Sequence, residues 1–460
     1  MNINEVKAIT NILSEFKVPC RVLPPPVSYQ TPRSNVYVLE RGAGIKESRI
    51  IEFETEIESA LGGIYGEQVG TRFLSSPLAI SVPRRDPQNV PIYPLLRKVK
   101  RNEPGQLLIA TGEHYNHAGS VRGNGVVPQI LQLDLMTPST SHMLIAGTTG
   151  VGKTGVLKNI ILSGALASSP ADVSWLIFDP KRRDFPILES LPHLAAPIFL
   201  TPESIAGGLR GLVEEMKLRG ERFDAMVAKV GVHQATIDAD QVFRPLIVAV
   251  IDEVAELVDQ LGKEAEGWIK RLLQIGRGLG IHLILGTQKP EADFISGISM
   301  ANLSVRACGA VSQLEHGKYA TGIPGKKLGA HKLTGKGDFL LTINATKVFP
   351  FQSGHIEAGE EIKIIGGIDS RWQGQRSKWQ LRWQPTDIDG SAQAQGNQAK
   401  RRQVDPVHAD MVDELLAHAR QSGSVPSPYE AQKIFKEKHG RTLNHNTANM
   451  LVERAQQLLM

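Results

Sequence analysis

The segment HMLIAGTTGVGKT, residues 142–154, constrains the fold of this chain more than any other. Its glycines and its closing Lys-Thr pair fill the template G-x-x-x-x-G-K-[ST], between a short apolar run and a helical pattern. Glycines let backbone N–H groups turn toward phosphate oxygens, and the helix that follows adds the positive end of its dipole. A glycine turn without a ligand is the alternative, which this context disfavours. The sequence therefore predicts an α/β fold with a triphosphate site.

The template assigns a role to each residue of the predicted loop. Lys153 would reach the β- and γ-phosphates, and the hydroxyl of Thr154 would coordinate Mg²⁺. We therefore expect ATP and Mg²⁺ as cofactors. The residues expected to hold the nucleotide are Gly147, Thr148, Thr149, Gly150, Val151, Gly152, Lys153 and Thr154.

An acidic pair follows the apolar run LIVAVI in the segment 246–253, which reads as a buried strand. Asp252 is placed to hold Mg²⁺, and Glu253 to polarise the attacking water as a general base. The pair could instead begin a helix as its cap and first-turn acid. With the phosphate loop upstream, we favour the catalytic interpretation.

The segment GRGLGIHLILGTQKP, residues 276–290, carries a cation before a predicted strand and an amide after it. Hydrolysis in ring ATPases needs a cation that a neighbouring subunit brings to the γ-phosphate, and Arg277 is a candidate. Arg277 could also be a solvated arginine at a helix end. Gln288 follows the strand, where ligands bind in open α/β sheets, and could sense the γ-phosphate.

Composition divides the 460-residue chain into regions. Short apolar strands alternate with helices around the phosphate loop, which is typical of a parallel sheet covered on both faces. Ser427 and Asn444 are expected N-caps of two late helices. The predicted regions are an α+β domain at 1–105, the nucleotide-binding domain at 106–365, an extension and flexible linker at 366–403, and a helix-turn-helix-like domain at 404–460.

Charge, hydrophobicity and cysteine content indicate which partners and which cellular compartment to expect. The net charge of +5 and the pI near 9.0 permit a polyanionic partner without requiring one. No apolar run reaches membrane-spanning length, and the N-terminus lacks a signal pattern. Cys20 and Cys308 lie far apart, so we expect neither a disulfide framework nor a zinc site, and a cytoplasmic protein. One apolar helical face is expected in a core, formed by Val6, Ile9, Leu13 and Phe16.

The ordered set of motifs resembles the motor domain of the FtsK/SpoIIIE family of double-stranded DNA translocases. The segments that carry the resemblance are HMLIAGTTGVGKT, LIVAVIDEVAELV, GRGLGIHLILGTQKPEADFISGISMANLSVRACGAVS and LTGKGDFLL. Upstream, VYVLERGAGIKESRIIEFETEIESAL resembles the linker-side α subdomain, and ISVPRRDPQNVPIYPLLRKV resembles its β-hairpin. The resemblance covers residues 18–350.

The resemblance implies a RecA-like P-loop ATPase core and a hexameric ring with duplex DNA in its pore. It makes Arg277 the finger that acts on a neighbouring subunit, with Arg306 as the alternative, and Gln288 matches the family's Thr-Gln position. Lys289 departs from the family's usual arginine. The family's membrane anchor is missing, and residues 404–460 match its winged-helix reader only loosely. We therefore expect a soluble translocase that serves a plasmid, an integrative element or a phage.

Two basic segments are candidate DNA contacts. The first, DPKRRDF, contains Lys181, Arg182 and Arg183, and the second runs from residue 322 to residue 338. Both could face the pore and neutralise phosphates without reading bases, or could be solvated surface. The DNA-contact residues that we expect are Arg182, Arg183, Lys326, Lys327, Lys332 and Lys336.

Three other functions remain open from the sequence. A conjugative coupling or DNA-packaging ATPase would use the same motifs. A non-motor regulator could use ATP as an assembly switch through its C-terminal helices, although Glu253 points to hydrolysis. A ring that moves polypeptides would favour aromatic pore loops, whereas aromatic residues make up only 5% of this chain.

Overall fold

The structure is a computed structural model of the whole chain. It describes residues 2–385 apart from 76, 104–105, 115–120, 123–124, 127–128, 237–242, 291–299, 325–327 and 358. Beyond 385 it describes residues 418, 427, 430–431, 433, 436 and 452. Contacts divide the chain into one unit at 1–388 and another at 389–460. The finer boundaries expected at 105, 365 and 403 stay predictions.

In the second unit, one expected helix start lies among the described residues. The hydroxyl of Ser427 accepts the N–H of Glu430 at 3.4 Å, and the carboxylate of Glu430 accepts the N–H of Ser427 at 2.8 Å. This reciprocal pair is a capping box, so the expected N-cap at Ser427 is confirmed. Asn444 and the expected linker from residue 386 lie outside the described residues.

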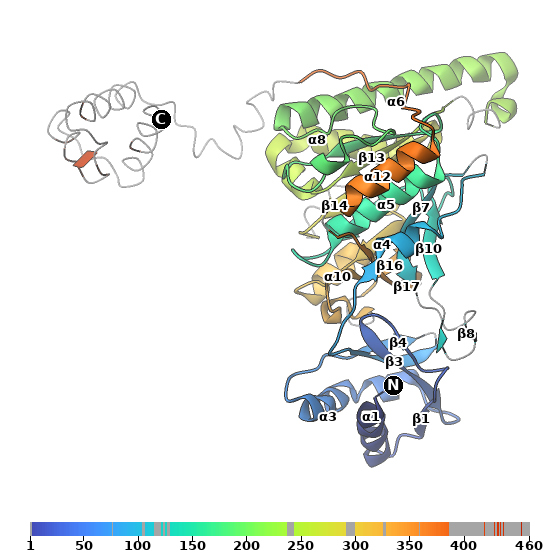
Figure 1. The fold of residues 1–460 in the computed structure, drawn as a ribbon, viewed down its shortest axis with the longest axis vertical. Helices are drawn as coiled ribbons and strands as arrows, with labels where there is room; N and C mark the ends of the chain where they lie inside the picture. The colour runs from blue at the N-terminus through green and yellow to red at the C-terminus, as the bar shows by residue number, and fades with distance from the viewer. Residues whose placement is uncertain are drawn as a thin grey trace. The chain divides into compact units, whose positions relative to one another are not determined.

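The chain begins with a small α+β layer, drawn in blue in Figure 1. A helix pair packs on a five-stranded sheet of order β1-β3-β5-β4, in which β2 also pairs with β3. Ile9 and Leu13 are buried in this core as expected, whereas Phe16 stays 39% exposed. The elements are α1 (Ile3–Glu15), β1 (Cys20–Val22), β2 (Tyr29–Gln30), β3 (Ser34–Arg41), α2 (Glu47–Ile51), α3 (Glu54–Tyr65), β4 (Arg72–Ser75) and β5 (Leu78–Pro83).

Part of the segment that resembles the family's β-hairpin forms a helix instead. Residues 92–96 make α4 (Ile92–Leu96), which begins after Pro91. Ile92, Leu95 and Leu96 follow each other at helical spacing and are buried in the core of the next domain. The helix is favoured because it places all three side chains on one face, whereas a strand would expose part of them.

A nine-stranded sheet forms the centre of the next domain, in the order β10-β7-β17-β16-β15-β11-β14-β13-β12. The five strands β11 to β15 pair in parallel, as expected, while the other four pair antiparallel. These strands are β7 (Leu108–His114), β10 (Gln129–Asp134), β11 (Met143–Ala146), β12 (Val173–Phe178), β13 (Leu246–Ile251), β14 (Ile281–Thr287), β15 (Val305–Cys308), β16 (Asp338–Ile343) and β17 (Lys347–Gln352).

The strand β16 differs from the expected parallel arrangement. It runs antiparallel to β15, and it also pairs antiparallel with β17 across the tight turn at Asn344 and Ala345, which both have φ of 52°. An apolar run that is buried on both faces looks the same in either direction, so its pattern could not reveal this. Two short pairs complete the strands: β6 (Val90–Pro91) with β18 (Gly354–His355), and β8 (Val121–Arg122) with β9 (Gly125–Val126).

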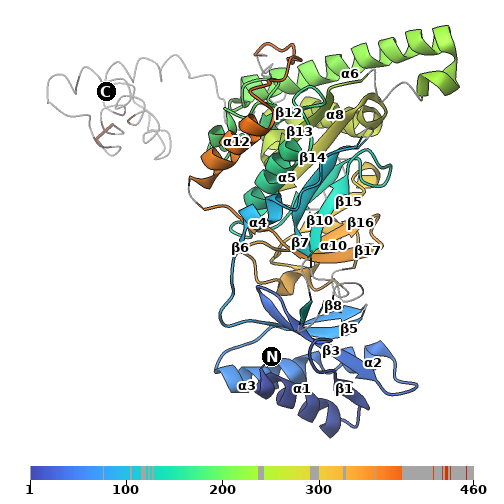
Figure 2. The ribbon, with the colours of Figure 1, turned by 45° about the vertical axis from the view of Figure 1, so that its right-hand side comes forward.

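Helices cover both faces of the large sheet, as Figures 1 and 2 show. Val248 and Val250 of β13 face one core with α5 and α12, while Ile247, Ala249 and Ile251 face the other core with α6 and α8. The helices are α5 (Lys153–Ala167), α6 (Pro202–Val230), α8 (Val254–Ile275), α10 (Leu314–Thr321) and α12 (Glu360–Arg371). The short 3-10 helices are η1 (Pro186–Leu188), η2 (Gly276–Leu279), η3 (Met300–Asn302) and η4 (Ala330–Lys332).

The segment after α12 packs against α5 and against the loop that follows β12. The indole N–H of Trp372 donates to the carbonyl of Ala165 at 2.8 Å, and Leu381 is buried with its N–H on the carbonyl of Ala195 at 2.9 Å. The expected extension is therefore ordered over these residues. Across the residues that the structure describes, no helix is both long and apolar enough to cross a bilayer.

Candidate nucleotide site and its neighbours

The predicted phosphate loop joins the end of β11 to the start of α5. Gly152, the last residue before the helix, has φ of 103°, a conformation that side chains with a Cβ rarely adopt. A Cβ at this position would also lie 2.8 Å from the nitrogen of Gly337. Lys153 is the first residue of α5, so the positive end of the helix dipole faces the loop. This is the strand–loop–helix geometry that the motif requires.

Lys153 lies deep in the site, with only 4% of its surface exposed. Its ammonium donates to the backbone carbonyl of Asp252 and to Oδ1 of the same residue, at 2.7 Å for the carboxylate. The carboxylate of Glu253 lies 3.7 Å away. The structure therefore brings together three residues that the sequence placed in one site.

Gln288 completes this cluster from the next strand. Its N–H donates to Oε1 of Glu253 at 2.8 Å, and its side-chain oxygen accepts the hydroxyl of Thr149 at 2.8 Å. Gln288 thus connects the phosphate loop to the acidic pair. A residue that senses the γ-phosphate would have to make such a connection.

Gly286 supports the cluster and was missed in the sequence. A Cβ on this residue would lie 2.2 Å from the backbone oxygen of Asp252 and 3.1 Å from the Lys153 ammonium. Only glycine therefore lets β14 approach the lysine and the acidic pair so closely. A glycine inside an apolar strand is the signal that could have revealed it.

The loop after β12 forms a further wall of the site. Oε2 of Glu253 pairs with the ammonium of Lys181 at 3.1 Å, and the carboxylate of Asp184 accepts the hydroxyl of Thr154 at 3.4 Å. From the sequence we predicted that this loop contacts DNA, and we did not connect it with the nucleotide site. Its position directly after a parallel strand was the available signal, because ligands bind at that edge of such sheets.

Asp179 holds the same loop in place. Its carboxylate is fully buried and accepts the N–H groups of Arg182 at 3.0 Å, Arg183 at 3.1 Å and Phe185 at 3.4 Å. Burial raises the pKa of Asp179 above its ordinary value, while these N–H groups act in the opposite direction. The backbone around Lys181 is thus fixed by one buried side chain.

The donor set fits a magnesium ion that is bound together with phosphates. The hydroxyl of Thr154 and the carboxylates of Asp252 and Asp184 are oxygen ligands, which Mg²⁺ prefers. In the described part of the chain, no group of three or more His, Cys, Asp or Glu side chains could hold a metal by itself. Mg²⁺ is usually bound through one or two carboxylates together with substrate phosphates and water, and Asp252 and Asp184 would supply the carboxylates.

Arg277 lies at the other edge of the sheet. It is exposed in η2, just before β14 begins, whereas Gln288 follows the end of that strand. A strand of this length spans about 20 Å, so Arg277 is far from the phosphate loop of its own subunit. Arg306 near the same edge donates to the carbonyls of Leu303 at 2.8 Å and Met300 at 2.9 Å. Of the two candidates, only Arg277 has its side chain exposed.

A buried arginine fixes the turn that carries Arg277. The guanidinium of Arg219 donates to the carbonyls of Leu279 and Phe243, both at 2.9 Å, and to that of Pro245 at 2.8 Å. Its Nε pairs with Glu215 at 2.9 Å. Arg219 is 2% exposed, so these bonds form in a desolvated environment, where they are stronger than in water.

Comparison with known proteins places this site in a family. The FtsK/SpoIIIE family profile matches residues 102–292, which contain the phosphate loop, the acidic pair and Gln288. Residues 102–292 form an FtsK/SpoIIIE family domain. The family expected from the sequence motifs is thereby confirmed.

Relatives of the FtsK/SpoIIIE domain extend beyond the matched residues. The DNA translocase FtsK of Clostridium acetobutylicum is 30% identical over 372 residues, which are 80% of this chain and 46% of that protein. The DNA translocase FtsK of Mycobacterium leprae is 29% identical over 378 residues, 79% of this chain and 42% of that protein. The chain thus spans less than half the length of these relatives.

A solved structure supports the fold of the FtsK/SpoIIIE domain. The cytoplasmic domain of the Thermomonospora curvata Type VII secretion ATPase EccC aligns with a TM-score of 0.53 at 20% identity. The alignment covers 65% of this chain and 36% of that one. The P-loop ATPase fold predicted from the sequence is confirmed, whereas this likeness says nothing about the substrate.

A second basic segment connects the FtsK/SpoIIIE domain to the N-terminal layer. The ammonium of Lys332 pairs with Glu54 at 2.9 Å and with Glu58 at 2.8 Å, both on α3. Arg33 donates to the carbonyl of Lys336 at 3.0 Å, and the N–H of Gly337 donates to the carbonyl of Val151 in the phosphate loop at 2.6 Å. Lys332 therefore has a structural role that sequence reasoning missed.

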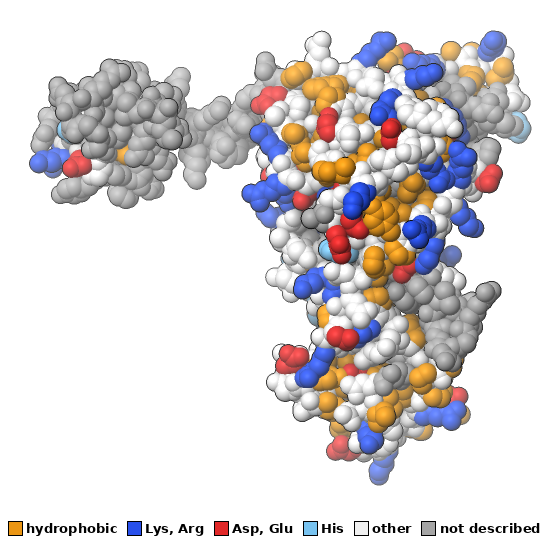
Figure 3. Space-filling view, viewed as in Figure 1, with side chains coloured by type: hydrophobic (Ala, Val, Ile, Leu, Met, Phe, Trp, Pro, Cys, Tyr) orange, Lys and Arg blue, Asp and Glu red, His pale blue; other side chains and the backbone are white. Residues whose placement is uncertain are grey.

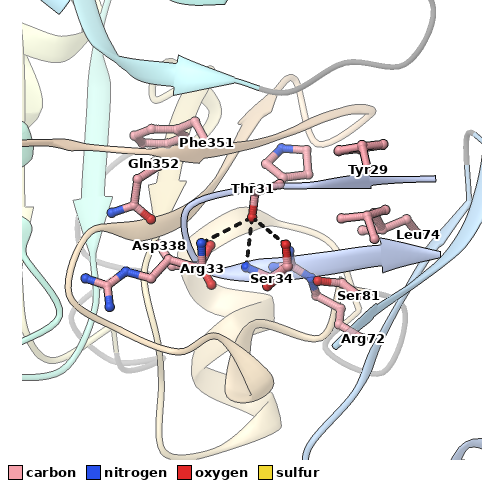
Figure 4. Close-up of a pocket in the computed structure, with 12 residues that line it drawn as sticks. Tyr29, Thr31, Arg33, Ser34, Arg72, Leu74, Ser81, Asp338, Phe351 and Gln352 are labelled. Carbon is pink, nitrogen blue, oxygen red and sulfur yellow. Dashed lines mark hydrogen bonds between the residues drawn. The ribbon is translucent and has the colours of Figure 1, made fainter. Parts of the chain in front are cut away.

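A cavity of about 40 Å³ lies at this junction and is shown in Figure 4. Strands of both layers line it, and its polar residues include Arg33, Arg72 and Asp338. Arg72 is 7% exposed, and its Nε and Nη1 have no hydrogen-bond partner among the described residues. The volume is sufficient for water. The junction of the two layers therefore encloses buried charged groups among apolar side chains such as Leu74 and Phe351.

The remaining expected DNA contacts are only partly described. Arg182 and Arg183 are exposed, and Nε of Arg182 donates to the carbonyl of Leu200 at 2.8 Å. Lys326 and Lys327 lie outside the described residues. On the face drawn in Figure 3, Lys and Arg side chains are scattered among acidic and uncharged ones. The described residues on that face therefore form no continuous basic track.

Of the four histidines that are buried among the described residues, His142, His193 and His282 predict the clearest pH dependence of stability. Burial lowers the pKa of His142 to about 3, and those of His193 and His282 to about 4. An unfolded histidine takes up a proton below about pH 6.5, so unfolding becomes easier as the pH falls from there. Below about pH 5.5, where the unfolded histidines are protonated, the expected loss in unfolding free energy approaches about 1.4 kcal/mol per pH unit for each histidine, or about 4 kcal/mol per unit for the three together.

Urea unfolding followed by tryptophan fluorescence at pH 7.5, 6.0 and 5.0 would measure this slope. The His193→Gln variant should lose about a third of it, because one proton fewer is taken up on unfolding. An unfolding free energy that stays constant between pH 6.0 and 5.0 would contradict the prediction.

Proposed function

We propose that this chain hydrolyses ATP and uses the energy to move double-stranded DNA. The observation that carries the proposal is the convergence of the phosphate loop, the acidic pair and Gln288 at one sheet edge of an FtsK/SpoIIIE domain. Its relatives named DNA translocase FtsK favour duplex DNA as the partner. ATP and Mg²⁺ are the proposed cofactors, and the cytoplasm is the proposed location.

In the proposed reaction, the loop N–H groups and Lys153 hold the phosphates, and Glu253 orients the attacking water. The water oxygen bonds to the γ-phosphorus, the bond to the bridging oxygen breaks with its electrons on ADP, and the water proton goes to Glu253. Mg²⁺ held by Thr154 and Asp252 would neutralise phosphate charge. Gln288 would sense the γ-phosphate, and its hydrogen bond with the hydroxyl of Thr149 would couple it to the phosphate loop.

The proposed assembly is a ring, and a hexamer is its expected size. Arg277 lies about 20 Å from the phosphate loop along β14, so it can serve a nucleotide only if that nucleotide belongs to a neighbouring subunit. A head-to-tail interface that closes on itself would bring each Arg277 to the next phosphate loop.

A conjugative coupling or DNA-packaging ATPase is the second candidate, because it would use the same site. The basic residues proposed to contact phosphates are Arg182, Arg183, Lys326, Lys327 and Lys336. Lys332 is left out because its ion pairs with Glu54 and Glu58 occupy it within the chain. A plasmid, an integrative element or a phage is the proposed context.

ATP hydrolysis and triplex displacement on linear duplex DNA would test the proposed function. A translocase should hydrolyse ATP faster when duplex DNA is present and should strip a bound third strand from it. A protein that hydrolyses ATP without DNA stimulation and leaves the triplex intact is not a translocase. Repeating both assays on a protein that lacks residues 404–460 distinguishes a motor from a regulator. A motor should keep its activity on DNA that it has already engaged, whereas a regulator that acts through its C-terminal helices should not.

Two lysines of the second basic segment give a salt-dependent prediction. Each phosphate contact makes log K for B-form DNA fall with log salt by about 0.9. The Lys326→Ala/Lys327→Ala variant should therefore flatten the slope by about 1.8, while ATP hydrolysis without DNA stays unchanged. Filter binding of duplex DNA over a salt series measures the slope. The control Lys363→Ala/Lys378→Ala removes the same charge from exposed positions elsewhere, and equal slopes for both variants would exclude the proposed contacts.

A further inference from the structure

The carboxylate of Glu253 is held on both sides. Oε1 accepts the backbone N–H of Gln288 at 2.8 Å, and Oε2 pairs with the ammonium of Lys181 at 3.1 Å. The side chain of Glu253 is 5% exposed, while that of Lys181 is 27% exposed. A buried carboxylate with both oxygens engaged has one defined orientation. Lys181 therefore contributes one of the two hydrogen bonds that hold this orientation, at the oxygen that also lies 3.7 Å from the Lys153 ammonium.

Lys181 reaches Glu253 because their strands are neighbours. Phe178 at the end of β12 pairs in register with Ile251 at the end of β13, so the segments that follow both strands emerge side by side. Asp179 then anchors the β12 loop through the N–H groups of Arg182 and Arg183. The position of Lys181 is thus determined by the sheet and by a buried anchor.

The two lysines near Glu253 have different roles in a site that holds nucleotide. Lys153 is the residue that the loop motif directs to the β- and γ-phosphates, and it lies 3.7 Å from Glu253. Lys181 belongs to another loop and is closer to the carboxylate. When Lys153 engages phosphate, Lys181 is the cation that remains on Glu253.

We propose that Lys181 is a positioning residue that orients the carboxylate of Glu253 toward the attacking water. This inference rests on the proposed function, in which Glu253 is the general base. Lys181 acts through Glu253 and makes no contribution of its own to phosphate binding. Its removal should therefore slow hydrolysis without weakening the binding of ATP.

A double-mutant cycle separates this role from phosphate binding. We expect Lys181→Met to lower kcat by about 10-fold or more, and Glu253→Gln to lower it by about 10²- to 10⁴-fold. In the Glu253→Gln background, Lys181→Met should cause no further loss, because the group on which it acts is gone. Single-turnover hydrolysis and titration with a fluorescent ATP analogue would measure the rate and the affinity.

Two further variants complete the experiment. Lys181→Arg should restore part of the rate, because a guanidinium can also pair with the carboxylate. Lys158→Met removes another partly buried ion pair of the same domain, with Glu361 at 2.9 Å, and should leave kcat unchanged. This control distinguishes the loss of a particular contact from the general loss of an ion pair.

Three results would overturn the role of Lys181: an unchanged kcat in Lys181→Met, a weakened affinity for the ATP analogue, or full additivity with Glu253→Gln. An unchanged rate in Glu253→Gln alone would instead remove Glu253 from the proposed reaction. The failure of the inference and the failure of the proposed function are therefore distinguishable.

Discussion

Glutamine at position 253 is expected to leave ATP bound and to slow its hydrolysis by about 10²- to 10⁴-fold. The amide keeps the shape of the carboxylate and its contact with the N–H of Gln288, but it cannot take a proton from the attacking water. Alanine at position 153 should instead abolish ATP binding or turnover, because the ammonium that reaches the phosphates is lost.

Equilibrium binding of a fluorescent ATP analogue and single-turnover hydrolysis would be measured on the same preparations. Glu253→Gln should retain the affinity of the parent and lose the rate, whereas Lys153→Ala should lose both. Parental turnover by Glu253→Gln would show that another group activates the water. Thermal unfolding curves check that both variants are folded.

The second large effect is expected from Arg277, through the neighbouring subunit. Arg277→Ala should bind ATP normally and hydrolyse it about 10³-fold more slowly or worse, as expected when an arginine finger is lost. Because Arg277 is exposed and precedes β14, we expect the loss to affect the nucleotide of another subunit.

Mixing subunits tests this directly. In rings of Arg277→Ala and Lys153→Ala subunits, an intact phosphate loop meets an intact Arg277 at about a quarter of the interfaces. Part of the activity should therefore return on mixing, although each variant alone is inactive. Absence of any recovery, with mixed rings verified by mass photometry, would mean that Arg277 does not act between subunits. An Arg306→Ala variant that complements in its place would identify the alternative finger.

Features that depend on a short stretch of chain could be predicted from the sequence. The phosphate loop, the acidic pair and Gln288 each follow an apolar strand, and parallel strands of one sheet bring their ends to the same edge. The apolar face of the first helix was also predictable, since Ile9 and Leu13 are buried at helical spacing. The direction of β16 was not, because its side chains are buried on both faces.

Contacts between distant segments depended on the tertiary structure. Lys181 and Glu253 are 72 residues apart, and Lys332 and Glu58 are 274 residues apart. Lys181 and Lys332 look alike in the sequence, as lysines of basic loops. One reaches the acidic pair and the other connects α3 to the large domain. From the sequence we predicted that both lysine loops contact DNA, and the sequence could not distinguish a lysine of the nucleotide site from one that joins two layers.

By itself, the sequence determined the P-loop ATPase fold and the residues of the phosphate loop. Both depend on patterns within a short stretch of chain: the glycine template of the loop and the spacing of apolar residues in each strand and helix. The tertiary structure alone decided which charges meet. The order of β12, β13 and β14 places Lys181 beside Glu253, and the docking of α3 places Glu54 and Glu58 beside Lys332. The sequence does not show which charged side chains will pair, because the pairing depends on which strands or layers become neighbours in the folded protein.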